Sequence, residues 1–167
     1  AYSFRSGFIY QNIMYLVAGM LVEEKSGMTW ERFMKEKVYQ PIGMEDTYPT
    51  LAYSMQYGNR SKAHWKTEDE IVPISEMPAD AIGPAGSTWS TAEDVAKWMQ
   101  FLLGDGKMND QQILEEHTLA KMFNPQVIIP TEQFYPTTRL TKPHWTTYAL
   151  GWFQQDYRGQ FLSFHTG

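Results

Sequence analysis

The spacing of the apolar residues changes along this chain, and that change constrains the fold more than any other feature. Near the start, apolar residues recur at helical spacing at Ile13, Leu16, Val17, Met20 and Leu21. Residues 148–155 instead alternate in the two-residue period of a strand, and a turn at 157–160 precedes a second strand over 161–166. The pattern predicts an α+β fold, mostly helical over residues 1–145, with a β-hairpin over 146–167.

Several signals define the expected helices. The apolar pattern predicts a buried helix from Ile13 to Lys25, with Asn12 at its entrance and Ser26-Gly27 at its end. Thr29 is placed to cap a second helix that stops at Pro41. Further helices are expected after Ser90-Thr91-Ala92-Glu93, which has the pattern of a capping box, and from Glu116 to Phe123.

The hairpin by itself is too small a sheet, because two strands alone are only marginally stable in water. We therefore expect it to be the incomplete edge of a larger antiparallel sheet in the α/β part of a domain. We also expect that flanking parts of that domain are missing from these 167 residues.

Composition excludes several classes of function. A net charge of -5 without a basic block argues against a nucleic-acid partner, and the absence of cysteine excludes disulfides and thiolate nucleophiles. His64, His117 and His144 are scattered away from any matching carboxylate cluster, so neither a metal nor another cofactor is expected. No apolar run approaches the roughly 20 residues that a membrane-spanning helix needs.

Polar residues at the two ends of the chain are the candidate site residues. Tyr10 and Asn12 place a phenol and a carboxamide two residues apart at a helix entrance, where both can face one cavity. The alternative is that Asn12 caps the helix and Tyr10 packs. His165-Thr166-Gly167 forms the tip of the last predicted strand, and the alternative for His165 is a partly buried structural role.

Together, Tyr10-Gln11-Asn12 and His165-Thr166-Gly167 resemble the second and third motifs of the serine β-lactamase and penicillin-binding-protein-like hydrolases. The pattern is most similar to the branch that contains class C β-lactamases, D-alanyl-D-alanine carboxypeptidases and esterases. Other stretches resemble the family in the same order, namely Gln40-Pro41-Ile42-Gly43-Met44, Pro84-Ala85-Gly86-Ser87 and Gly151-Trp152. The resemblance implies a β-lactamase/transpeptidase-like fold, with the catalytic centre between a helical and an α/β subdomain.

The resemblance also implies roles for the candidate residues. In this family a Ser-x-x-Lys motif supplies the nucleophile, and Tyr10 would relay protons between that serine and the leaving group. Asn12 would hold a substrate amide or the lysine, while His165 and Thr166 would contact substrate carboxylate or carbonyl groups. Gly167 would keep the strand edge open to a small-molecule or peptide substrate. A histidine at position 165, where many members carry lysine, favours esters or D-amino-acid peptides over β-lactams.

The chain departs from the family because it contains no Ser-x-x-Lys. In the family this motif lies upstream of the tyrosine motif, so it would precede Ala1. We therefore expect a fragment of a serine hydrolase, inactive alone as a covalent catalyst, whose partner is a complementary segment carrying Ser-x-x-Lys. The alternative is a non-catalytic binding or sensor module with the same fold.

Overall fold

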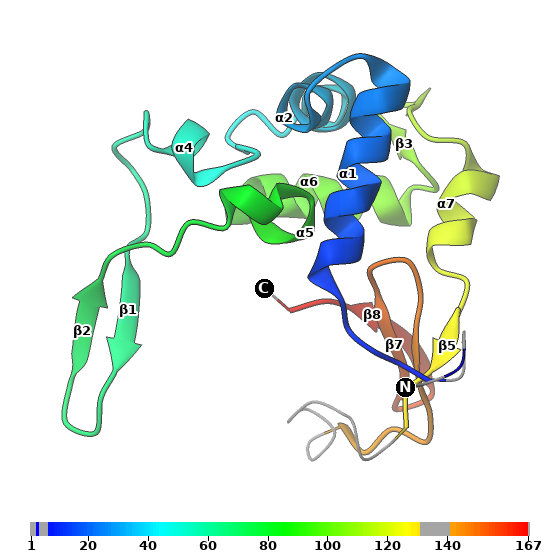
Figure 1. Ribbon diagram of the computed structural model, residues 1–167. Helices are drawn as coiled ribbons and strands as arrows, with labels where there is room; N and C mark the ends of the chain where they lie inside the picture. The colour runs from blue at the N-terminus through cyan, green and yellow to red at the C-terminus, as the bar shows by residue number, and fades with distance from the viewer. Residues whose placement is uncertain (1–2, 4–6, 131–140, 167) are drawn as a thin grey trace. The chain divides into compact units, whose positions relative to one another are not determined.

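The computed structural model describes residue 3, residues 7–130 and residues 141–166. The chain divides into two compact units. The helical unit comprises residues 11–101, and the sheet unit comprises residues 1–10 together with residues 102–167. The described residues contain helices and antiparallel strands (Figure 1), so the predicted α+β class is confirmed.

The helical unit contains most of the helices and one small hairpin. In chain order its elements are α1 (Asn12–Ser26), α2 (Trp30–Phe33), the π-helix η1 (Met34–Tyr39), α3 (Gln40–Ile42), α4 (Leu51–Ser54), β1 (Ala63–Lys66), β2 (Ile71–Ile74), the 3₁₀-helix η2 (Asp80–Ile82), α5 (Gly83–Gly86) and α6 (Ala92–Leu103). Strands β1 and β2 pair antiparallel, with Trp65 opposite Val72. Within this unit the hairpin extends away from the helices (Figure 1).

Helix α1 is not buried on its apolar stripe, so that prediction was wrong. Ile13 is 61% exposed and Met20 59% exposed among the described residues. The helix instead packs through the face around Gly19, its buried residue, which lies against α5. A Cβ built on Gly19 would lie 2.2 Å from Pro84 Cγ, so only glycine permits this close contact.

In the segment after α1, the predicted helix cap is present but the predicted break at proline is not. Thr29 Oγ1 accepts a hydrogen bond from the backbone N–H of Arg32, as the sequence predicts for the cap of α2. The expected break at Pro41 does not occur: the π-helix η1 runs directly into α3, which carries Pro41 in its first turn. The helical path ends at Gly43, whose φ of 80° is the left-handed conformation that glycine favours.

Helix α6 begins at a buried polar cluster around Asp94. Its cap is Thr91, whose Oγ1 accepts from the backbone N–H of Asp94, and not Ser90 with Glu93 as expected. Ser90 Oγ lies 2.8 Å from Thr47 Oγ1. Thr47 uses its own proton to donate to Asp94 Oδ2, so Ser90 is the donor to Thr47. The predicted cap was displaced because the Ser90 hydroxyl is engaged by another segment.

Asp94 joins α6 to the turn that follows α3. Its carboxylate accepts hydrogen bonds at 2.8 Å from the backbone N–H of Asp46 and from Lys97 Nζ. Lys97 Nζ also donates to the carbonyl oxygen of Gly43, at 2.7 Å. Burial, the largest influence, acts to raise the pKa of Asp94, but the hydrogen bonds from Lys97, Thr47 and Asp46 together hold that pKa below its ordinary value.

The sheet unit is built on a four-stranded antiparallel sheet with the order β5-β6-β7-β8. Its elements are β3 (Lys107–Met108), β4 (Gln111–Gln112), α7 (Glu116–Met122), β5 (Val127–Ile128), β6 (Thr146–Tyr148), β7 (Phe153–Tyr157) and β8 (Gln160–Phe164). Arg158 and Gly159 connect β7 to β8 with φ values of 50° and 78°, the left-handed pair of a type I′ hairpin turn. Both residues lie in the turn that the sequence predicts.

The single strand expected over residues 148–155 is interrupted. Gly151 has a φ of 85°, and the backbone N–H of Ala149 donates to the carbonyl of Trp152 at 2.8 Å. This tight turn reverses the chain, so Tyr148 on β6 pairs with Phe153 on β7. Alternation of side chains could not reveal the turn, because a left-handed glycine leaves the two-residue pattern on either side intact.

The exposed side chain of His144 contacts Asp156 in strand β7 of the same sheet. Asp156 on β7 accepts from the backbone N–H of His144 at 2.7 Å and lies 2.6 Å from His144 Nδ1. The hydrogen bond and the charge of Asp156 raise the pKa of His144. The contact fixes the segment before β6 against β7.

We expect Asp94→Asn to lower the free energy of unfolding by about 1–3 kcal/mol, because it removes the charge that accepts from Lys97 and Thr47. The folded-state pKa of Asp94 is depressed, so its stabilisation is present above the unfolded pKa of about 3.9 and is lost as the pH falls through the folded value. Urea unfolding at pH 7 and at pH 3 measures both effects.

The matched control is Glu93→Gln, which changes an exposed carboxylate in the same first turn of α6. Equal losses of stability in the two variants, or a loss for Asp94→Asn that is as large at pH 3 as at pH 7, would contradict the role assigned to Asp94.

Candidate active site

The site begins with a row of aromatic side chains on one face of the sheet. Tyr148, Phe153 and Phe164 lie opposite one another on β6, β7 and β8, so their rings point to the same face. Phe153 is only 1% exposed, and its ring lies 4.8 Å from Tyr148 and 5.7 Å from Phe164, measured between centroids. This row makes a rigid apolar support.

In the segment before α1, Tyr10 packs on this row of aromatic rings. The Tyr10 ring is nearly parallel to the Phe153 ring, with an angle of 6° and a centroid distance of 6.3 Å. Two residues earlier, Phe8 contacts Tyr148 at 5.3 Å. Alternate residues of an extended segment face the same side, so Phe8 anchors the backbone that positions Tyr10.

The structure brings Tyr10 and His165 together from opposite ends of the sequence. Tyr10 Oη lies 3.2 Å from His165 Nε2, across a separation of 155 residues. The His165 ring also packs 5.6 Å from Phe153. Both residues are exposed, Tyr10 by 39%, so the pair is open to a ligand.

The hydrogen bonds of His165 determine where its proton lies. His165 Nδ1 is 2.6 Å from the carbonyl oxygen of Thr166. A carbonyl can only accept, so Nδ1 carries the proton. In the neutral imidazole Nε2 is then unprotonated and accepts the proton of the Tyr10 hydroxyl. The geometry therefore allows a proton to pass from the phenol to the imidazole, which leaves Tyr10 able to accept another proton.

The other predicted site residues are placed as follows. Asn12 is the first residue of α1 and is exposed, in the helical unit. It does not cap α1, whose N-cap is Gln11 without a side-chain hydrogen bond. Thr166 is exposed and holds His165 through its backbone carbonyl. Gly167 lies outside the described residues.

Sequence reasoning missed the aromatic support, in particular Phe153 and Phe8. Phe8 was visible in the sequence next to Tyr10, and its two-residue spacing from Tyr10 was the available signal. Phe153 gave no such signal, because its position beneath Tyr10 depends on the turn at Gly151.

Within the described part of the chain, no group of three or more His, Asp or Glu side chains is arranged to hold a metal ion. The same described residues include no helix long and apolar enough to cross a bilayer.

Comparison with known proteins identifies the family. The family model described as Beta-lactamase matches residues 1–167. The chain belongs to the β-lactamase family. An unguisins hydrolase of Aspergillus campestris is 26% identical over 168 residues, which cover 98% of this chain but 29% of that protein. This β-lactamase-family chain thus spans less than a third of that relative's length.

Solved structures show the same fold. The octameric penicillin-binding protein homologue from Pyrococcus abyssi has a TM-score of 0.75 at 20% identity, covering 98% of this chain and 34% of that one. A D-amino acid amidase from Ochrobactrum anthropi, solved with L-phenylalanine amide, has a TM-score of 0.71 at 21% identity, covering 96% and 43% of the two chains. The resemblance to β-lactamase/transpeptidase-like proteins is confirmed.

The tautomer of His165 is directly testable. At a pH where the imidazole is neutral, ¹⁵N NMR should show a protonated Nδ1 and an unprotonated Nε2. In Tyr10→Phe, Nδ1 should remain protonated, because its carbonyl acceptor is unchanged. A neutral His165 with its proton on Nε2 would contradict the direction of the Tyr10 hydrogen bond.

Proposed function

We propose that this chain is the part of a serine hydrolase that supplies the proton-relay residues, in a protein that performs acyl transfer through a serine ester. The observation that carries the proposal is the Tyr10 Oη to His165 Nε2 contact of 3.2 Å, formed between two motifs of the family. The names of related proteins, which include a hydrolase and an amidase, support this class of reaction.

The nucleophile in this proposal comes from a Ser-x-x-Lys segment of the full-length protein, since this sequence contains none. Tyr10 releases its proton to His165 Nε2 and takes the proton of the serine hydroxyl as the serine oxygen attacks the substrate carbonyl. The tetrahedral intermediate then collapses and the bond to the leaving group breaks. Tyr10 gives the proton taken from the serine to the leaving group, and His165 Nε2 returns its proton to Tyr10. Water repeats the sequence on the acyl ester and frees the serine.

The remaining motif residues bind substrate. Asn12 hydrogen-bonds a substrate amide or the catalytic lysine, and Thr166 contacts a carbonyl or carboxylate group of the substrate. His165 Nε2 faces the Tyr10 hydroxyl, so it is not positioned to donate to a substrate carboxylate. Esters, amides and D-amino-acid peptides are accordingly the proposed substrates.

The expected result for Tyr10→Phe in the full-length protein is a fall in kcat/KM of roughly 10²- to 10⁴-fold, because a positioned proton-transfer group is removed. The matched control is Tyr53→Phe, which deletes an exposed hydroxyl on α4 and should leave activity unchanged. Full turnover in Tyr10→Phe would remove Tyr10 from the mechanism.

A double-mutant cycle distinguishes a relay from two separate roles. If Tyr10 and His165 act as one unit, the fall in kcat for Tyr10→Phe combined with His165→Ala should be close to that of Tyr10→Phe alone. Fully additive losses would show that His165 contributes independently of Tyr10.

A further inference from the structure

A second candidate site lies wholly within the helical unit. A cavity of about 340 Å³ is bounded by three chain segments, around Asp46 to Tyr48, Tyr57 to Ser61 and Trp89 to Thr91. Its volume is at the lower end of the range for small-molecule pockets, about 300–1,000 Å³. None of its lining residues is a motif residue of the candidate active site.

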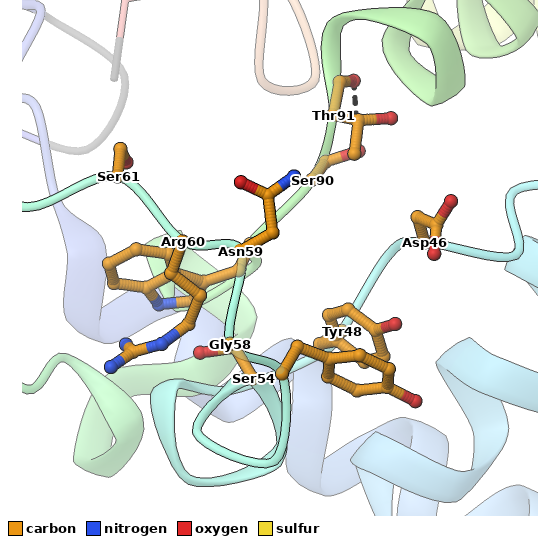
Figure 2. A pocket seen from close by; sticks show the side chains of 11 residues that line it. Asp46, Tyr48, Ser54, Gly58, Asn59, Arg60, Ser61, Ser90 and Thr91 are labelled. Atoms are coloured by element: carbon orange, nitrogen blue, oxygen red, sulfur yellow. Dashed lines mark hydrogen bonds between the residues drawn. The ribbon is translucent and has the colours of Figure 1, made fainter.

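One side of the cavity is acidic and aromatic. Tyr48 and Tyr57 stack with their ring centroids 4.2 Å apart, and the carboxylate of Asp46 lies beside them (Figure 2). No described residue forms an ion pair with Asp46. Burial, followed by the neighbouring Tyr57 and Asp46, raises the pKa of Tyr48, so its hydroxyl stays protonated near neutral pH. A carboxylate that lacks an ion-pair partner among the described residues and lies beside a tyrosine pair suits an ammonium group.

The other side of the cavity is basic. Figure 2 shows Arg60 on the opposite side of Asn59 from Asp46 and Tyr48. The Arg60 guanidinium lies over the Trp89 ring at 5.7 Å. Glu76 approaches it at 3.5 Å, longer than the 2.8 Å of the Lys97 to Asp94 pair.

The guanidinium of Arg60 is incompletely satisfied. Its Nη1 is buried and has no hydrogen-bond partner among the described residues. A guanidinium has five N–H donors, and the single long contact with Glu76 leaves most of them unused. Arg60 is one of the residues that line the cavity, and a carboxylate bound there could accept from its guanidinium.

From this arrangement we propose that the cavity binds a small zwitterion, no larger than a free amino acid or a dipeptide. This site is separate from the candidate active site. The ammonium group lies at Asp46 and the tyrosine pair, and the carboxylate lies at Arg60. An aromatic side chain on the ligand finds matching surfaces in Tyr57 and Trp89. The opposite charges at the two ends select a ligand that carries both charges over one that carries either alone.

The test uses phenylalanine as the probe, titrated into the full chain by isothermal calorimetry. Saturable binding is expected, with at least tenfold weaker binding of phenylalanine amide, which lacks the carboxylate, and of N-acetylphenylalanine, which lacks the ammonium group. Arg60→Gln should weaken phenylalanine at least tenfold while leaving the amide within about twofold. Asp46→Asn should also weaken the binding of phenylalanine at least tenfold, while leaving the binding of N-acetylphenylalanine within about twofold.

Two outcomes would overturn the proposal: no saturable binding, or binding that is insensitive to both Asp46→Asn and Arg60→Gln. Binding that is lost in Tyr10→Phe and in His165→Ala but kept in the cavity variants would place the amino acid at the candidate active site, leaving the proposed function intact. If Arg60→Gln fails to fold by circular dichroism, Asp46→Asn decides, because this substitution keeps the backbone N–H through which Asp46 donates to Asp94.

Discussion

The stacking of Tyr10 on Phe153 is the contact on which the candidate active site depends. Phe153 is fixed from both sides, by Tyr148 on β6 and Phe164 on β8, and it cannot shift without disturbing the sheet. The same ring lies next to His165. One buried phenylalanine therefore sets the positions of a phenol and an imidazole that are far apart in the sequence, and it does so through contacts with their rings.

The helical unit is organised by a different kind of interaction. Asp94 is nearly fully buried, and its negative charge is balanced by hydrogen bonds from three separate positions: Asp46, Thr47 and Lys97. Burying a carboxylate is costly unless its partners are well placed, so these contacts fix the turn at Gly43 relative to α6. The same turn carries Asp46 to the edge of the proposed amino-acid cavity.

Features that depend on neighbouring residues could be predicted from the sequence, whereas features that depend on contacts between distant segments could not. The cap at Thr29, the helix from Glu116 and the turn at Arg158-Gly159 depend on nearby residues, and each was found. The face on which α1 packs was missed, because Pro84 against Gly19 is a contact between segments far apart in the chain. The family motifs suggested that Tyr10 and His165 belong to one catalytic centre, but their hydrogen bond and the aromatic support beneath them were visible only in three dimensions.

The most direct test of the account is denaturing intact-mass spectrometry after treatment with a fluorophosphonate, which labels activated serines. The account predicts that this 19.4 kDa chain alone stays unlabelled, and that the full-length protein gains one adduct, on the serine of a Ser-x-x-Lys motif outside this sequence. An adduct on the isolated chain would show that it carries its own nucleophile. If the full-length protein does not react with the fluorophosphonate, the proposal of a serine hydrolase is contradicted and the non-catalytic binding or sensor module is favoured.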